Sequence, residues 1–384
     1  MCLSSLLFFC SFSMIIPELP SYLEGLGGAD YKGWIIGLFA MTAAFSRPVS
    51  GKLADRVGRV PVIVFGTVVC MVCGGLYPFV LSVPGFLLLR MVHGMSTGFT
   101  PTGTSSYVAD IAPANRRGEA LGIQTLCANV GTAYGPALGS MLTNEYGINT
   151  LFYTSSGFSM LSILVLLGLK ETLQDKEKFS PKMLNIHRDE VVERRVLLPG
   201  LVLVMMVFSF GLNLTIIPDF SDHLGLENKG IFFTYLTIAS ICVRFFAGKA
   251  SDIWGREVVL MAAASTLILA MVYISQADTK VDLLIGACIF GFAHGIAGPT
   301  VFAWTIDLAR PGKLGRAIAT TFIALEVGIF MGAFISGWMY GNEVERFGET
   351  FLLGASMAGI GLIILVFDHF VGGNRNRFAL REEV

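Results

Sequence analysis

The sequence is poor in charge. Asp, Glu, Lys and Arg make up 14% of its 384 residues, whereas a soluble domain carries roughly 25%. The chain has no GxxxxGKS/T phosphate loop and no HExxH helix, which argues against ATP-driven work and metalloprotease chemistry. Its seven cysteines lie in apolar runs, where we expect small buried side chains and not disulfides. We therefore expect that the protein is not an enzyme and that it has no cofactor and no metal site.

Long apolar runs are what the sequence has instead, since 54% of its residues are hydrophobic. The runs persist for about 20 residues, the length of a membrane-spanning helix. Twelve runs lie near residues 2–24, 32–50, 60–81, 84–109, 118–142, 149–169, 197–221, 230–248, 257–276, 283–306, 315–340 and 349–370. This pattern predicts an all-α membrane protein with twelve transmembrane helices.

One long polar stretch divides these runs into two sets of six. It predicts an N-terminal bundle over 1–169, a cytoplasmic linker over 170–196, a C-terminal bundle over 197–370 and a tail over 371–384. When the loops are assigned alternately to the two sides, 20 of the 27 Lys and Arg residues fall on one side and four on the other. By the positive-inside rule the basic side, which holds both termini and the linker, is cytoplasmic.

The two sets of runs are related by an internal repeat. The charged segment Gly51–Arg59 (GKLADRVGR) returns as Gly248–Arg256 (GKASDIWGR), at an offset of 197 residues. Asp110 and Asp307 share the same offset. The repeat predicts two pseudo-symmetric six-helix bundles around a central site, the layout of many secondary transporters.

Three motifs resemble those of the major facilitator superfamily. Gly51–Arg59 resembles its motif A, and Arg90 with its following glycines resembles motif B. The segment 131–139 resembles motif C, which is associated with antiporters, and it contains Gly131, Gly135, Pro136 and Gly139. Val60 and Ser140 depart from the usual motifs. The resemblance covers the whole chain and is closest to the twelve-helix drug/proton antiporter and metabolite-efflux branch.

The resemblance implies that the repeated charged segments form a cytoplasmic latch. Asp55 would cap the eleventh helix near residues 314–316, where free N–H groups and the helix dipole favour a carboxylate. Arg59 would reach Asp110. The full set is Gly51, Asp55, Arg56, Gly58, Arg59 and Asp110, then Asp252, Arg256 and Asp307, with Arg47 and Arg244 about one turn above the loops. The alternative is that these charges only set the topology.

The glycines at 131, 135 and 139 recur every four residues, so they predict close approach of a neighbouring helix. Pro136 removes one backbone hydrogen bond and predicts a bend in the same helix. We expect this bend to seal or hinge the outer side.

Ionisable residues within the membrane are candidates for proton coupling, because charge is costly there. Glu326 lies about 16 Å into its predicted helix at about 1.5 Å per residue, and His294 lies at a similar depth. Arg90 is expected to tune a nearby acid, for which Glu18 is the candidate, and Asp219 is its repeat counterpart. The alternatives are a structural arginine partner for Glu326, an interface role for His294 and a water-facing position for Glu18.

Four uncharged or weakly basic residues are candidates for the substrate cavity: Asn213, Gln124, Asn129 and His93. Polar residues in membrane helices also form interhelical hydrogen bonds, worth about 0.6 kcal/mol each, so this alternative stays open for the four.

The sequence thus predicts a secondary active transporter of the plasma membrane that exports a small amphiphile, such as a drug or metabolite, in exchange for protons by a rocker-switch mechanism. Its partners are the small-molecule substrate, protons and the lipid bilayer. We expect a monomer and no nucleic-acid partner. The alternatives are proton-coupled uptake, lipid flipping in the same fold, and a membrane sensor that transports nothing. A few side chains decide the cargo in such folds, so the sequence leaves it open.

Overall fold

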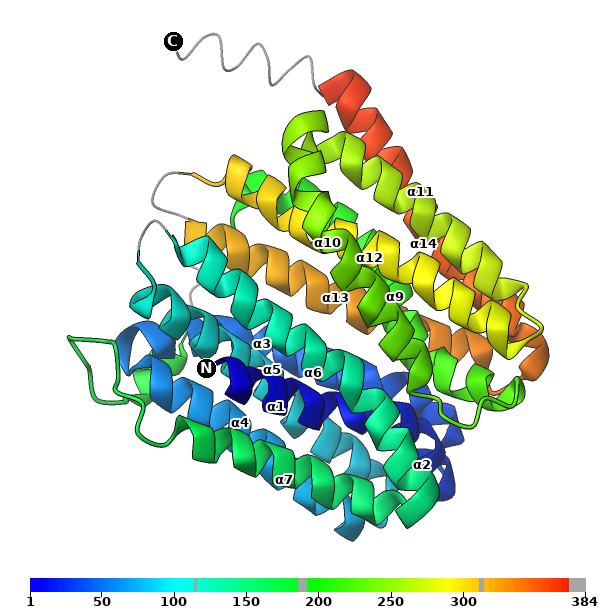
Figure 1. The fold of residues 1–384 in the computed structure, drawn as a ribbon, viewed down its shortest axis with the longest axis horizontal. Coiled ribbons are helices and arrows are strands. Elements are labelled where there is room, and N and C mark those ends of the chain that lie inside the picture. Colours follow the sequence, from blue (N-terminus) through cyan, green and yellow to red (C-terminus); the bar gives the residue numbers. More distant parts are fainter. Residues whose placement is uncertain (114–115, 186–191, 311–313, 373–384) are drawn as a thin grey trace.

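The computed structural model describes residues 1–113, 116–185, 192–310 and 314–372, and regular structure in these ranges is helical. The helices run as two groups side by side (Figure 1). Part of the predicted linker, 186–191, and the tail from residue 373 lie outside the described residues.

The first half has six membrane-length spans. The first is broken: α1 (Cys2–Met14) and α2 (Leu19–Gly25) are joined by a 3-10 turn at Ile16–Glu18, because Pro17 cannot continue the α-helix hydrogen bonds. The other five are α3 (Lys32–Arg56), α4 (Arg59–Leu76), α5 (Val83–Ile111), α6 (Arg117–Tyr146) and α7 (Ile148–Leu166).

The second half repeats this layout with six more. These are α9 (Leu197–His223), α10 (Ile231–Trp254), α11 (Arg256–Ser275), α12 (Lys280–Leu308), α13 (Leu314–Tyr340) and α14 (Phe347–Phe367). In the described part of the chain, eight spans are long and apolar enough to cross a membrane, or nine if the bent α10 counts as one. The remaining three, α3, α5 and α6, are richer in polar residues. The fold is the predicted all-α membrane protein in two six-helix bundles.

The repeated charged segments differ from the predicted loops. The second span does not end near residue 50 but continues as helix α3 to Arg56, because Lys, Leu, Ala and Arg all favour helix. Only Val57 and Gly58 separate it from α4. Gly58 has φ of 141° and Gly255 in the second copy has φ of 89°, a region that side chains other than glycine rarely adopt.

The cores of the two halves differ in chemistry. The second half has a large apolar core that includes Phe208 and Phe290. In the first half, α1 and α7 are also tied by hydroxyl groups, with 2.8 Å between the Oγ atoms of Ser4 and Ser162. Six cysteines are at least partly buried, as expected, but Cys242 is exposed on α10.

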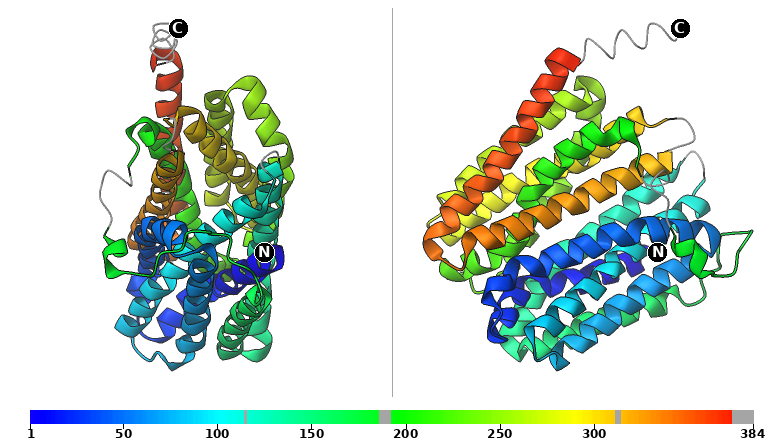
Figure 2. Two further views of the ribbon diagram at one scale, coloured as in Figure 1. Left: turned by 90° about the vertical axis from the view of Figure 1, so that its left-hand side faces the viewer. Right: turned by 180° about the vertical axis from the view of Figure 1, so that it is seen from behind.

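The halves meet along two helix pairs, α3 with α13 and α6 with α10 (Figure 2). We call the end that carries Gly51–Arg59 and Gly248–Arg256 the basic end, and the other the opposite end. Near the opposite end α3 and α13 touch through their backbones. A Cβ atom on Gly33 would lie 2.7 Å from the carbonyl oxygen of Ala333 and would also crowd Gly337.

Candidate functional site

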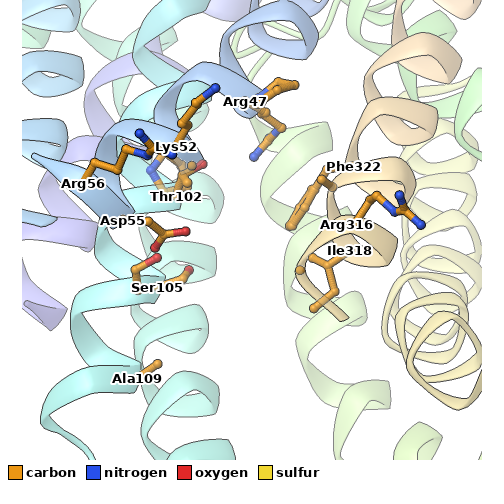
Figure 3. Close-up of a pocket in the computed structure, with 16 residues that line it drawn as sticks. Arg47, Lys52, Asp55, Arg56, Thr102, Ser105, Ala109, Arg316, Ile318 and Phe322 are labelled. Carbon is orange, nitrogen blue, oxygen red and sulfur yellow. The ribbon is translucent and has the colours of Figure 1, made fainter. Parts of the chain in front are cut away.

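A cavity of about 450 Å³ lies between the halves, and another of about 660 Å³ adjoins it toward the basic end. Both are lined by Arg47, Pro101, Ser105 and Phe322. Figure 3 shows the basic-end cavity, with α3 and α5 on one wall and α13 on the other. It reaches the surface, because the Asp55 side chain on its wall is 73% exposed. The path to the central cavity therefore runs from the basic end.

An ion pair joins the two halves across the central cavity. Arg47 of α3 donates from Nη2 and Nε to Oε1 of Glu326 on α13, at 2.7 and 3.2 Å. The guanidinium of Arg47 also lies 4.4 Å from the ring centroid of Phe322. Both partners are mostly buried, at 12% and 7% exposure. We expected Arg47 about one helical turn from the basic end. It lies deeper in the protein than that, because α3 extends nine residues beyond it.

Arg90 is buried in the wall of the same cavity. Its Nε donates to the carbonyl oxygen of Ile35 at 3.1 Å, its Nη1 to the hydroxyl of Tyr77 at 3.3 Å, and its guanidinium lies 4.5 Å from the ring of Phe39. The predicted pairing of Arg90 with Glu18 is wrong. All of these Arg90 partners are uncharged.

Arg244 on α10 and His294 on α12 also line the central cavity. The His294 ring is stacked on Phe210, with 4.8 Å between centroids and 14° between planes. The Nε atom of Arg244 is buried without a hydrogen-bond partner among the described residues. Arg244 therefore belongs to the cavity and not to the turn near the basic end.

Two of the four predicted cavity residues lie elsewhere. Gln124 and Asn129 of α6 line the central cavity. His93 is buried inside the first half, where its Nδ1 lies 3.2 Å from the hydroxyl of Tyr77. Asn213 is buried in α9, and its amide has no partner in the described part of the chain. Neither His93 nor Asn213 is among the described residues that line the cavity.

The opposite end is closed by an ion pair and a hydrogen bond that cross between the halves. Lys32 of α3 donates to Asp219 of α9 at 2.5 Å and lies 3.0 Å from a carboxylate oxygen of Glu24. Lys229 of the second half donates to the hydroxyl of Ser21 in the first at 2.8 Å. Asp219 is therefore a closing contact here. Sequence reasoning missed Lys32, which it counted only as one of four outer charges.

A second closing contact joins α6 to the start of α10. Ser140 Oγ donates to Oε1 of Glu18 at 2.6 Å and accepts from the backbone N–H of Gly230 at 3.1 Å. A Cβ atom on Gly230 would overlap the backbone of Pro136. Glu18 is buried at this junction and not at a water-facing position. Ser140, where the sequence departs from motif C, supplies the hydrogen bonds.

The motif C glycines pack α6 against α1 in the same half. A Cβ atom on Gly131, Gly135 or Gly139 would come against backbone oxygens of α1. The close helix approach that small residues permit is thus made within the first bundle. It uses a different face of α6 from the one that contacts α10.

The two charged segments form matching ion pairs at the basic end. Arg59 Nε donates to Asp110 at 3.1 Å, and Arg256 Nε donates to Asp307 at 2.9 Å. Each pair lies within one half, between the first turn of one helix and the end of another, so neither crosses between the halves.

Asp55 does not cap α13 in this conformation. It accepts from Nη1 of Arg59 at 3.0 Å, and Asp252 accepts from Arg256 in the second copy. Asp55 lies on the α3 wall of the basic-end cavity (Figure 3). Gly315 of α13 lines the same cavity. Gly51 and Arg56 line the same wall as Asp55.

Two linker carboxylates that were not predicted as site residues bind near the starts of helices α4 and α13. Glu171 accepts from the N–H groups of Arg59 and Val60, each at 3.0 Å. Burial alone would raise the pKa of Glu171, but these and neighbouring N–H donors lower it overall. Glu193 has a side chain only 1% exposed and accepts from Arg316 of α13 at 2.5 Å. The hydrogen bond from Arg316 lowers the pKa of Glu193.

Twelve spans in two repeated bundles, with a cavity that is open at one end and closed at the other, define a membrane transporter. The chain belongs to the Major Facilitator Superfamily, whose family model matches residues 1–333 and 200–377. It is a multi-pass membrane protein of that transporter family.

Relatives cover most of the chain at low identity. The multi-drug resistance efflux pump PmrA of Streptococcus pneumoniae is 27% identical, over 84% of each chain. The quinolone resistance protein NorA of Staphylococcus aureus is 22% identical, over 94% of each. Among solved structures, the nucleoside transporter NupG has a TM-score of 0.79 at 13% identity, over 95% of this chain and 98% of that one. A D-xylose–proton symporter has 0.75 at 15%, over 95% of each.

Proposed function

We propose that the protein exports a small amphiphile across the plasma membrane in exchange for protons, as a monomer. The basic end and both termini then face the cytoplasm, in agreement with the positive-inside rule. The curated relatives, which are named as efflux pumps and resistance proteins, support export.

The Arg47–Glu326 pair is the observation that carries proton coupling. Glu326 is the only carboxylate among the described residues that line the central cavity. When Glu326 is ionised, its charge is balanced by Arg47 across the two halves. A proton on Glu326 removes that charge and weakens the tie between α3 and α13. Proton and substrate therefore bind in the same cavity. Each favours a different one of the two conformations, which differ in how the two halves are placed against each other.

The contacts at the two ends support a rocker switch. The opposite end is held by Lys32 with Asp219 and by Ser140 with Gly230, and both contacts cross between halves. In the alternate state these contacts open and the basic-end cavity closes. Asp55 then approaches the first turn of α13, where a carboxylate is stabilised by free N–H groups.

A third cavity favours an amphiphilic cargo. It has about 330 Å³ and lies between α3 and α13, with Met41, Phe45 and Phe330 in its lining. Phe45 is an exposed aromatic residue on a membrane helix, and the buried Glu326 lines the same cavity. An apolar molecule in the bilayer can thus approach the ion pair from the side.

The test is transport in inside-out membrane vesicles with an acidic lumen. Three naphthalene probes are offered: a carboxylate, its amide and the corresponding amine. We expect at least one probe to accumulate, and accumulation to stop when nigericin collapses the pH gradient. Glu326→Gln should abolish gradient-driven accumulation, while Glu343→Gln, in the turn before α14, should preserve it. Accumulation that survives both nigericin and Glu326→Gln would refute proton coupling.

A further inference from the structure

The central cavity carries an excess of positive charge. Arg47, Arg90 and Arg244 line it, with Glu326 as the one carboxylate among the described lining residues. Arg47 is neutralised by Glu326, and Arg90 is bound to a carbonyl, a phenol and an aromatic ring. Arg244 has no hydrogen bond, ion pair or aromatic-ring contact to a described residue. Of the three, Arg244 is the one without any such partner among the described residues.

The internal repeat explains why Arg244 lacks a counter-ion. The 197-residue offset that relates Arg47 to Arg244 relates Glu326 to Asn129 and Phe322 to Thr125. The helix pair α3–α13 has its counterpart in α6–α10, and both pairs pack across the junction of the halves. Asn129 and Thr125 line the same cavity as Arg244. At the repeat positions where the first arginine has a carboxylate and a ring, the second half has an amide and a hydroxyl.

A guanidinium without a partner is costly within the membrane, and the Nε of Arg244 is buried without a hydrogen-bond partner among the described residues. Arginine presents a planar fork of N–H donors that matches a carboxylate in a two-pronged geometry. Hydrogen bonds between charged groups are stronger than neutral ones, and the low dielectric of such a cavity strengthens them further. The missing carboxylate at position 129 can therefore be supplied by a ligand.

We propose that the substrate is an amphiphilic organic carboxylate whose anionic group binds Arg244. The carboxylate would lie beside Arg244 as Glu326 lies beside Arg47 in the other half of the repeat. Its apolar body lies against the stacked rings of Phe210 and His294, which form the adjacent part of the cavity. The volume of about 450 Å³ is in the range of small-molecule sites. This assignment rests on the proposed export function and specifies its cargo.

The test is ligand-induced thermal stabilisation of the purified full-length protein. Naphthalene, biphenyl and dodecyl scaffolds are each compared as carboxylate, amide and amine. We expect at least one carboxylate to bind about tenfold more tightly than its own amide, as a charge-assisted pair predicts. Arg244→Gln should remove this preference and Arg244→Lys should keep part of it. Arg346→Gln, on a surface turn at the opposite end, is the matched control and should leave it unchanged.

Asn129→Glu is the sharper variant, because it rebuilds on α6 the carboxylate that α13 already has. It should pair with Arg244, raise the melting temperature of the ligand-free protein and abolish carboxylate binding. Arg244→Gln should not lower that temperature, since it removes a charge whose Nε is buried without a partner among the described residues. A lowered melting temperature in both variants would show that Arg244 has a structural partner, and would overturn the proposal.

The proposal is also overturned if no carboxylate binds more tightly than its amide, or if Asn129→Glu binds carboxylates as the natural protein does. Neither result touches the export proposal, which is judged by nigericin and Glu326→Gln in vesicles. If proton coupling fails there while the carboxylate preference at Arg244 holds, the binding site stands without the coupling.

Discussion

Replacing Lys32 with methionine should open the opposite end. Lys32 is almost fully buried between Asp219, at 2.5 Å, and Glu24, at 3.0 Å. Removing one partner of a buried pair costs about 3–5 kcal/mol. Glu24 is 59% exposed and adds little, and Asp219 can take up a proton. We therefore expect the closed opposite end to lose roughly 2–3 kcal/mol, which is a shift of about 30- to 150-fold between the two states.

Electron–electron double resonance between spin labels measures this shift directly. Labels on Glu145 and Glu345, which are exposed on the two halves at the opposite end, should move apart in Lys32→Met. Lys280 lies at the same end and has no ion-pair partner among the described residues. The distance distribution of Lys280→Met should therefore equal that of the natural protein. Equal distributions in Lys32→Met and Lys280→Met would refute the reasoning that the Lys32 pairs hold this end closed.

Two further predictions concern stability. Gly139→Ala should lower the melting temperature, by an amount equivalent to about 1–3 kcal/mol, because the added methyl overlaps the α1 backbone; Gly122→Ala, with no atom within 4 Å, should not lower it. Glu193→Gln should lower the melting temperature at pH 7, because the lowered pKa of Glu193 reflects its bond to Arg316. A lowered pKa stabilises the folded state above the ordinary value of 4.5, so this difference should shrink as the pH falls below that value. Glu177→Gln, at a half-exposed surface pair, should show no such dependence, and a constant difference for Glu193→Gln would argue against its charge as the cause.

The spans and the repeat could be predicted because long apolar runs and equal spacing are local properties of the sequence. The turn at Gly58 is shorter than predicted, because charged residues such as Lys52 and Arg56 end an apolar run without ending a helix. Hydropathy marks where a chain leaves the apolar layer, whereas a helix continues as long as its backbone bonds are satisfied.

The site was only partly predictable. Glu326 and His294 were found because charge at membrane depth is rare. The partner of Glu326 is 279 residues away in the sequence, and the pairing depends on how the two helices are rotated against each other. Successive residues of a helix point about 100° apart, so the sequence could not decide whether His93 faces the cavity or the bundle interior. Lys32 was missed because a charge at the end of a predicted span is also what a solvated loop would show.

The two linker carboxylates have a consequence for how the chain is divided. Glu171 closes the start of α4, and Glu193 closes the start of α13 through Arg316. Each of these two linker residues is thus bonded to its own bundle. The protein should therefore work as a split transporter: residues 1–185 and 192–384, produced in one cell as separate polypeptides, should assemble in the membrane through the same α3–α13 and α6–α10 contacts.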